Sequence, residues 1–327
     1  MNGYTLLNPF QNEDAGFSRW TLATKGEKEY FLKEFLDPIY PIEESLSEKL
    51  RLDRIHTCEE YEKIKRKMYE SVNNASDGNL VRIIEFFRYD SHYYIATEKI
   101  ERKKLTMKEV ACLPMEDKIL LCKSIAHSMM CLHNAGIVHS DIKEGNVLLK
   151  ETTTGRLIGK IIDFDACFFE NNPPDNEDDL GGDQVYLAPE SCQFLFGDSI
   201  RLNRKIDVFA LGLLFHQYLT GEMPGFNTNE YDYAHEAVLD DNDLVLSVEL
   251  PSELRQLIQN MLSVNPKERP KMETVYDILT NLDFELRSVC VDAGITGQTI
   301  SKTDTPNLTK NTPDKKFDKY FYQAGDL

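Results

Sequence analysis

The first hundred residues contain short runs of β-favouring, partly apolar residues separated by turn sequences. Two such runs, Trp20 to Thr24 and Tyr30 to Leu32, flank the turn residues Lys25-Gly26-Glu27 and predict a hairpin. Further on, "LVRIIEFF" and "HYYIATEKI" predict a second strand pair, which turns at Tyr89-Asp90-Ser91. This part of the chain is therefore expected to be mostly strands.

One predicted helix interrupts these strands. Residues 58–72, "CEEYEKIKRKMYESV", are rich in charge, and their apolar side chains fall on a single stripe formed by Tyr61, Ile64, Met68 and Val72. That spacing predicts a charged helix with one apolar face.

Beyond residue 100 the pattern becomes helical. An apolar stripe runs from about Met115 to His133, and residues 207–218, "DVFALGLLFHQY", are apolar nearly all round, which suits a helix buried in the centre of a lobe. Strands first and helices second predict an α+β protein with two lobes. We expect a small β-rich lobe over residues 1–98, a hinge and larger helical lobe over 99–290, and a polar, flexible tail over 291–327.

The charge balance narrows the class of partner. Thirty-seven basic and fifty-five acidic side chains give a formal net charge of −18, which would repel both a nucleic-acid backbone and an anionic membrane surface. No stretch approaches the roughly 20 apolar residues that a membrane span needs. We therefore expect neither nucleic acid nor membrane as a partner, and the sequence indicates no oligomeric state.

The seven cysteines are scattered along the chain without CxxC pairs, and several lie in apolar runs such as "LLCKSIAHSMMCL". The first residues show neither a basic start nor an apolar block. These features predict reduced core thiols in a cytoplasmic protein.

The stretch "GIVHSDIKEGNVLL", from Gly136 to Leu149, carries the clearest chemistry. Asp141 and Asn146 can present two oxygen atoms from one loop, and Lys143 adds a positive charge between them. Phosphoryl transfer requires a base that orients a hydroxyl group, oxygen ligands for Mg²⁺ and cations near the transferred group.

The same stretch resembles the catalytic loop of the protein kinase superfamily, and further motifs follow in the family's order: "DFD" from Asp163, "YLAPE" ending at Glu190, "DVFALG" from Asp207 and "PKERP" with Arg269. The resemblance covers about residues 10 to 285 and implies a bilobal kinase-like fold. It implies that Asp141 is the catalytic base, that Lys143 lies near the γ-phosphate, and that Asn146 and Asp163 are ligands of Mg²⁺. It also implies that Asp207 holds the catalytic-loop backbone and that Glu190 pairs with Arg269.

The resemblance also implies an ATP site. Lys33, near the end of a predicted strand, matches the lysine that grips the α- and β-phosphates. Thr97 would guard the back of the nucleotide pocket, and Glu98 to Ile100 would form a hinge whose backbone groups bind adenine. The implied cofactors are ATP and Mg²⁺.

Two parts of this ATP site depart from the family. The glycine-rich loop is reduced to "EDAGFS", in which only Gly16 remains and Ser18 occupies the third glycine position, so the backbone cannot approach the phosphates as closely. The helix glutamate that should pair with Lys33 is expected to be Glu62, with Glu59 and Glu60 as alternatives.

The loop that follows Asp163 departs as well. Asp165 replaces the family's glycine and either adds a carboxylate near the metals or serves as a turn residue. Ser140 stands where many regulated kinases carry the arginine that receives an activation-loop phosphate, and residues 166–185 contain no Ser, Thr or Tyr. Asp183 takes the place of a threonine and is expected to hold Lys143. The acidic side chains of the same loop could supply fixed negative charge instead of a phosphate.

These features together predict an ATP- and Mg²⁺-dependent kinase of protein Ser/Thr hydroxyl groups, since Lys143 follows Asp141 by two residues as in that branch. Without a phosphate acceptor in the activation loop, the enzyme is expected to be constitutively active. Two alternatives remain open: a pseudokinase that serves as a binding module, suggested by the glycine-poor loop and Asp165, and a small-molecule kinase of the aminoglycoside-phosphotransferase kind.

Overall fold

The computed structural model describes residues 1–12, 18–42, 47–76 and 78–292, and the chain divides into two compact units, Met1–Arg287 and Ser288–Leu327. Apart from the end of the last helix, the described helices and strands belong to the first unit. The tail expected from residue 291 lies almost entirely outside the described residues.

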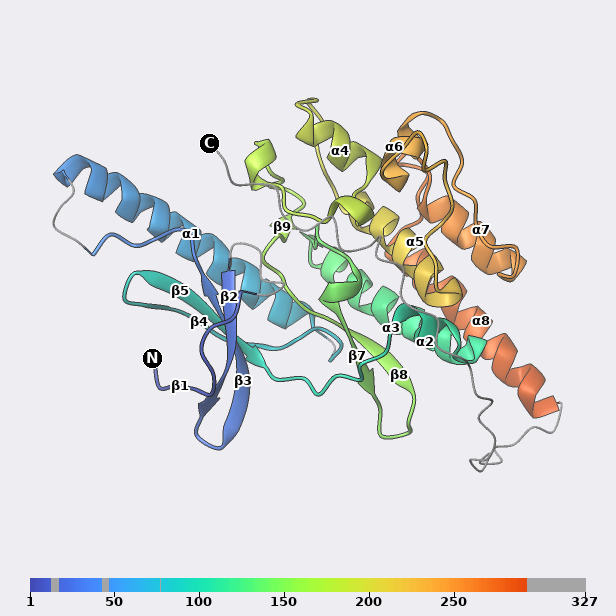
Figure 1. Ribbon diagram of the computed structural model, residues 1–327, viewed down its shortest axis with the longest axis horizontal. Coiled ribbons are helices and arrows are strands. Elements are labelled where there is room, and N and C mark those ends of the chain that lie inside the picture. Colours follow the sequence, from blue (N-terminus) through green and yellow to red (C-terminus); the bar gives the residue numbers. More distant parts are fainter. Residues whose placement is uncertain (13–17, 43–46, 77, 293–327) are drawn as a thin grey trace. The chain divides into compact units, whose positions relative to one another are not determined.

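An antiparallel five-stranded sheet forms the first part of the fold, in the order β1-β2-β3-β5-β4 (Figure 1). Its strands are β1 (Thr5–Leu6), β2 (Ser18–Lys25), β3 (Lys28–Phe35), β4 (Ile83–Tyr89) and β5 (His92–Glu98). The β2–β3 hairpin closes from Lys25 to Lys28 with Gly26 at φ +65°, a left-handed conformation that costs glycine little. Both predicted strand pairs are confirmed, whereas β1 was not predicted.

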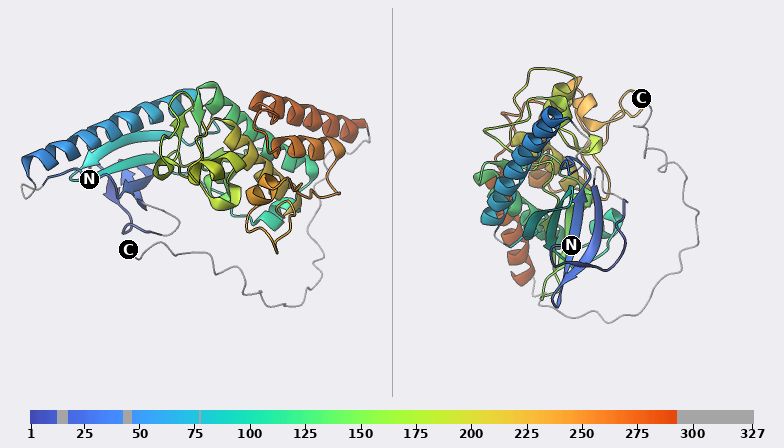
Figure 2. Two further views of the ribbon diagram at one scale, coloured as in Figure 1. Left: turned by 90° about the horizontal axis from the view of Figure 1, so that it is seen from above. Right: turned by 90° about the vertical axis from the view of Figure 1, so that its left-hand side faces the viewer.

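Helix α1 (Glu48–Ala75) lies along this sheet and packs against β4 (Figure 2). It begins ten residues before the predicted start at residue 58. Met68 and Val72 are buried as predicted, but Ile64 is 54% exposed. Cys58 and Tyr69 are buried in addition, so the helix is rotated relative to the predicted stripe.

The second part of the fold is mainly helical, as predicted. Its helices are α2 (Met107–Ala111), α3 (Met115–Asn134), α4 (Pro189–Leu195), α5 (Lys205–Thr220), α6 (Ala234–Leu239), α7 (Ser252–Met261) and α8 (Met272–Asp292). Short strands form two small antiparallel ladders, β6 (Ile137–Val138) with β9 (Phe168–Phe169) and β7 (Val147–Glu151) with β8 (Leu157–Ile161). The α+β, two-lobed fold class is confirmed.

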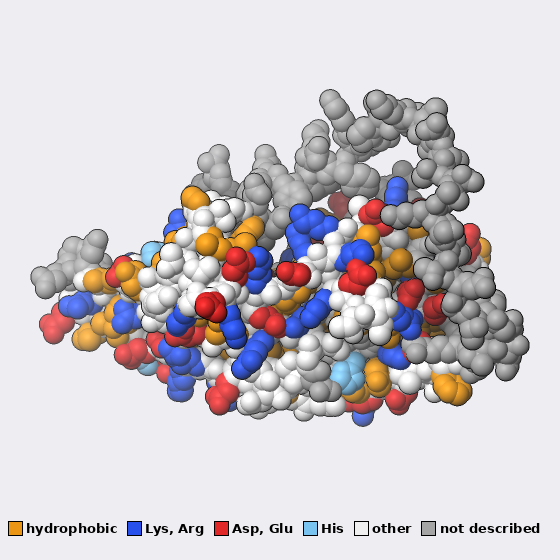
Figure 3. All heavy atoms as spheres, turned by 90° about the horizontal axis from the view of Figure 1, so that it is seen from below, with side chains coloured by type: hydrophobic (Ala, Val, Ile, Leu, Met, Phe, Trp, Pro, Cys, Tyr) orange, Lys and Arg blue, Asp and Glu red, His pale blue; other side chains and the backbone are white. Residues whose placement is uncertain are grey.

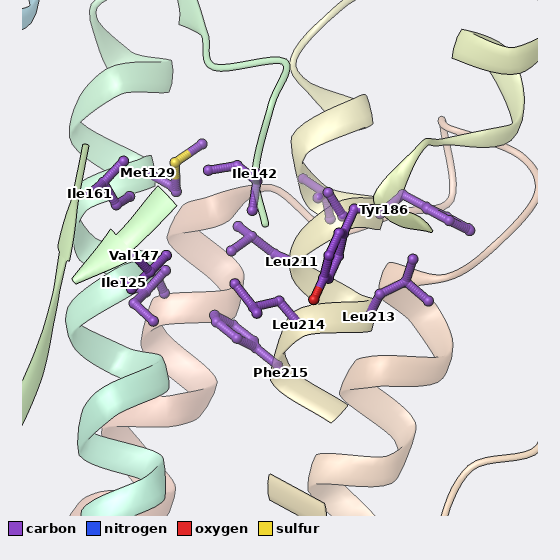
Figure 4. Close-up of a cluster of buried hydrophobic side chains, with 14 of the residues drawn as sticks. Ile125, Met129, Ile142, Val147, Ile161, Tyr186, Leu211, Leu213, Leu214 and Phe215 are labelled. Atoms are coloured by element: carbon purple, nitrogen blue, oxygen red, sulfur yellow. The ribbon is translucent and has the colours of Figure 1, made fainter. Parts of the chain in front are cut away.

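A continuous hydrophobic core holds the segments that carry the candidate chemistry (Figure 4). Side chains of α3, α5 and the β7–β8 ladder meet there, including Ile125, Val147 and Leu211. Gly159 of β8 allows the close approach of α3, because a Cβ atom at this position would lie 2.4 Å from Cγ1 of Ile125. The ladder that follows the catalytic loop is therefore fixed against the most buried helices.

On the face shown in Figure 3, acidic and basic side chains are interspersed. Within the described residues, no helix has the length and apolar character of a membrane span. Six of the seven cysteines are reduced and form no disulfide: Cys58, Cys112, Cys122, Cys131, Cys167 and Cys192.

Candidate active site

The buried carboxylate of Asp207 in α5 fixes the catalytic loop. Its two oxygen atoms accept hydrogen bonds from the backbone amides of His139 (2.9 Å) and Ser140 (2.8 Å), and Nε2 of His133 also bonds to it at 2.9 Å. Asp207 is 1% exposed, so these charge-assisted bonds form away from water. They hold Ser140 at φ +70°, a left-handed conformation that few residues adopt without such support. The role expected for Asp207 is present in the structure.

Asp141 lies in the middle of a polar group on this loop. The side-chain amide of Asn146 donates to Oδ2 of Asp141 at 2.8 Å and to its backbone carbonyl at 2.7 Å. Nζ of Lys143 lies 3.0 Å from the same Oδ2 and 3.9 Å from Oδ2 of Asp183, as expected. Oδ1 of Asp141 is buried and has no hydrogen-bond partner among the described residues. This oxygen can therefore accept a proton or a hydrogen bond from a bound hydroxyl group.

Lys33 and Asp163 form an ion pair in the site. Lys33 lies on β3, and its Nζ atom is 3.0 and 2.9 Å from the two carboxylate oxygens of Asp163. Nζ also lies 2.5 Å from Oδ2 of Asp165. Burial disfavours the charge of Lys33, but the carboxylates of Asp165 and Asp163 raise its pKa above the ordinary value. Lys33 thus stays charged at neutral pH.

The two carboxyl groups are distinguished by their surroundings. Burial and the neighbouring Asp165 raise the pKa of Asp163, while Lys33 opposes this shift. Burial also acts on Asp165, but Lys33 and Lys65 hold the pKa of Asp165 below its ordinary value. Asp163 adopts φ +62°, and Phe164 is buried with its ring edge against His139. The structure therefore holds the 163–165 segment in a strained but fixed conformation.

The expected pair between Lys33 and Glu62 is not formed. The carboxylate of Glu62 binds Arg66 on its own helix, and Glu60 pairs with Lys63. Glu59 is exposed. Lys33 pairs with Asp163 and Asp165 instead, so the expected pair of Lys33 with Glu62 is corrected.

Lys65 and Tyr69 reach the site from α1 in place of a glutamate. Nζ of Lys65 donates to the backbone carbonyl of Asp165 at 2.6 Å, and the hydroxyl of Tyr69 donates to Oδ1 of Asp165 at 3.1 Å. Neither residue was predicted. Their signal in the sequence is the four-residue spacing of Tyr61, Lys65 and Tyr69, which places the three side chains on one helical face.

The residues expected at the adenine end lie in and after β5. Thr97 pairs with Phe31 of β3, and the backbone amide of Glu98 donates to the carbonyl of Arg82. The side chain of Glu98 accepts from the amide of Arg82 and pairs with Lys160 of β8. The amide and the carboxylate of Glu98 are therefore both engaged within the protein.

The expected glycine-poor loop is described only in part. Ser18 begins β2 and is 4% exposed, with its backbone in register with Phe35. Gly16 and the other residues of 13–17 lie outside the described residues.

The activation segment is tied to the catalytic loop and to the helical core. The hydroxyl of Ser140 donates to the carbonyl of Gly181 at 3.1 Å. Glu170 forms a two-pronged pair with Arg204, and the buried carboxylate of Glu190 accepts from both terminal nitrogens of Arg269 at 2.7 and 2.8 Å. The Glu190–Arg269 pair expected from the sequence is thus present.

The oxygen atoms of Asp163 and Asn146 fit a Mg²⁺ ion, which prefers carboxylate and carbonyl ligands. The amide nitrogen of Asn146 is directed at Asp141, so the same bonds fix the orientation of its amide oxygen. Among the described residues, no group of three His, Cys, Asp or Glu side chains forms a metal cage. A metal here would take its remaining ligands from water or from a phosphate, as Mg²⁺ commonly does.

The fold and the order of the motifs around the site are those of a protein kinase domain. The family model of the protein kinase domain matches residues 49–278, and the chain belongs to the protein kinase family.

The chain is similar to several curated serine/threonine-protein kinases. It is 24% identical over 270 residues to a probable serine/threonine-protein kinase of Clostridium perfringens, an alignment that covers 80% of this chain and 37% of that protein. It is 28% identical over 219 residues to the serine/threonine-protein kinase PSK2 of Saccharomyces cerevisiae, covering 63% of this chain and 18% of that protein. It is also 28% identical over 194 residues to the serine/threonine-protein kinase shk1/pak1 of Schizosaccharomyces pombe, covering 59% of this chain and 28% of that protein. The chain thus spans well under half the length of these relatives.

Proposed function

We propose that this protein transfers the γ-phosphoryl group of ATP to Ser or Thr hydroxyl groups of protein substrates. The observation that carries the proposal is the buried Oδ1 of Asp141, which is without a partner among the described residues although its other oxygen is fixed by Asn146 and Lys143. The curated relatives are named serine/threonine-protein kinases, which supports the same choice of acceptor.

The roles of the chain's own residues follow from these contacts. Oδ1 of Asp141 accepts the proton of the substrate hydroxyl, and Lys143 offsets the negative charge that develops on the transferred group. Lys33 supplies a fixed positive charge for the α- and β-phosphates. Asp163 and Asn146 would hold Mg²⁺, which when bound neutralises the phosphate oxygens.

Constitutive activity is the second part of the proposal. Ser140 bonds directly to Gly181 of the activation segment, so a neutral hydrogen bond replaces the usual arginine–phosphate contact. Phosphatase-treated protein is expected to keep its rate within about twofold, and a rate that is lost with phosphatase and restored by an added kinase would contradict this part.

A binding module remains the second candidate function. It is favoured by one observation, namely that the expected Lys33–Glu62 pair is absent while Lys33 binds both Asp163 and Asp165. A small-molecule kinase has no such specific support.

The test uses labelled ATP and Mg²⁺ with three samples: a mixture of generic protein acceptors, an aminoglycoside and no acceptor. Label on Ser and Thr of the proteins supports the proposal, and the Asp163→Asn variant is expected to lower it by about a hundredfold or more. Label on the aminoglycoside alone would identify a small-molecule kinase. ATP binding without any transfer would favour the binding module.

A further inference from the structure

The cluster around Lys33 contains more negative charge than phosphoryl transfer by this fold requires. Two carboxylates, Asp163 and Asp165, lie within ion-pair distance of a single lysine that is 12% exposed. Two neighbouring like charges are costly unless each has its own partner. If Asp163 is committed to Mg²⁺, as the proposed function requires, Asp165 is the carboxylate left to hold Lys33.

Asp165 is placed for this role by α1. One carboxylate oxygen bonds to Lys33, and the other accepts from the hydroxyl of Tyr69 at 3.1 Å. The Asp165 carbonyl accepts from Lys65, one turn earlier on the same helix. Tyr69 is buried, with its ring 5.3 Å from that of Phe86 on β4, so its hydroxyl group has a fixed position.

We infer that Asp165 is the positioning residue of Lys33, and that it replaces a helix glutamate by carrying the negative charge on the 163–165 segment while α1 supplies the hydrogen-bond donors Lys65 and Tyr69. This inference rests on the proposed function. The link between α1 and β3 is kept, but its polarity is reversed: the helix now donates, and the segment after Asp163 accepts. A movement of α1 would therefore act on Lys33 through Asp165.

The first test replaces Asp165 by Asn, which keeps the shape of the side chain and removes its charge. We expect the KM for ATP to rise and kcat/KM for ATP to fall by about tenfold to a hundredfold, while the KM for the protein acceptor stays unchanged. A purely structural defect would lower the amount of active enzyme and leave the KM for ATP unchanged. Asp53→Asn, which neutralises an exposed acid on the outer part of α1, is the matched control and should behave as the wild type.

The second test returns the charge to the helix. Asp165→Gly alone should impair ATP use more than Asp165→Asn. Adding Lys65→Glu should recover at least part of the loss, because the Lys65 side chain extends to the backbone carbonyl of Asp165, the residue whose carboxylate is lost. No recovery in the double variant would overturn the inference of a relocated charge, as would an Asp165→Asn variant with wild-type kcat/KM and wild-type nucleotide affinity.

Equilibrium binding of a fluorescent ATP analogue separates this inference from the proposed function. If the wild type transfers no phosphate, the proposed function fails. Weaker nucleotide binding by Asp165→Asn would still support the positioning role in that case, and unchanged binding would overturn it.

Discussion

The hydroxyl group of Ser140 donates a hydrogen bond to the backbone carbonyl of Gly181 over 3.1 Å and so joins the catalytic loop to the activation segment. The bond needs no modification to form, since both partners are present in the translated chain. The same residue is held by Asp207 through its amide, so one position receives restraints from the core and from the segment.

Ser140→Ala removes this contact and should lower kcat by about fivefold, the effect of one neutral hydrogen bond of about 1 kcal/mol. The melting temperature should change little, because the bond lies between loops. Steady-state kinetics with Thr154→Ala, an exposed hydroxyl in the β7–β8 turn, provides the control. Equal rates for both variants and the wild type would show that the contact is dispensable.

The acidic side chains of the activation segment are expected to contribute unequally to stability and activity. Glu170 forms the pair with Arg204, whereas Asp175, Glu177, Asp178 and Asp179 are exposed and form no ion pair within the described residues. Glu170→Gln should therefore lower the stability by about 1 kcal/mol and reduce activity, and neutralising the other four together should do neither. Urea unfolding and turnover measured on both variants decide this, and a loss of activity in the fourfold variant alone would reverse the assignment.

The buried pair of Glu190 and Arg269 should matter for stability. The Arg269 side chain is fully buried and donates to Glu190 as well as to the carbonyls of Ser263 and Lys205. Arg269→Met leaves the Glu190 carboxylate unpaired and should cost about 3–5 kcal/mol of unfolding free energy. In the double variant with Glu190→Gln, a large part of that loss should disappear. Additive losses would mean that the two residues act separately.

His216 predicts a pH dependence of stability. It is 2% exposed; its Nε2 accepts from the amide of Ser247 at 3.1 Å, and its Nδ1 bonds to the carbonyl of Glu222, which defines the neutral ring. Burial lowers the pKa of His216. The unfolded chain therefore binds the proton more readily, and stability should be complete above about pH 6.5 and decrease as the pH falls below it.

Urea midpoints at about pH 7.5 and about pH 5.5 measure this dependence, with His216→Gln as the comparison. The decrease on acidification should be smaller in the variant, although His235, whose pKa burial also lowers, should leave part of it. An equal decrease in both proteins would exclude His216 as the cause.

The sequence predicted local parts of the site better than distant ones. The loop from Asp141 to Asn146 could be anticipated because its chemistry lies within six residues, and the buried helix around Asp207 because it is apolar on every side. The partner of Lys33 could not be anticipated, since it depends on the rotation of α1. Most positions on this helix are polar, so a stripe through Ile64 was as consistent with the spacing as the true face through Lys65 and Tyr69. Asp165 could be recognised as unusual, but its bond to Lys33 spans the two lobes and has no local signal.

Transfer of labelled γ-phosphate to Ser and Thr of a protein acceptor, measured for the wild type and for Asp141→Asn, tests directly whether the protein is a kinase that uses Asp141 as its base. The substitution replaces one carboxylate oxygen by an NH2 group, so the side chain becomes neutral and can no longer act as a base. The hydrogen bond from Asn146 to the backbone carbonyl of residue 141 can remain. We expect clear transfer by the wild type, a decrease of about a hundredfold or more in the variant, and unchanged binding of ATP by both. Transfer by the variant at the wild-type rate, or none by the wild type despite bound ATP and Mg²⁺, would contradict this expectation.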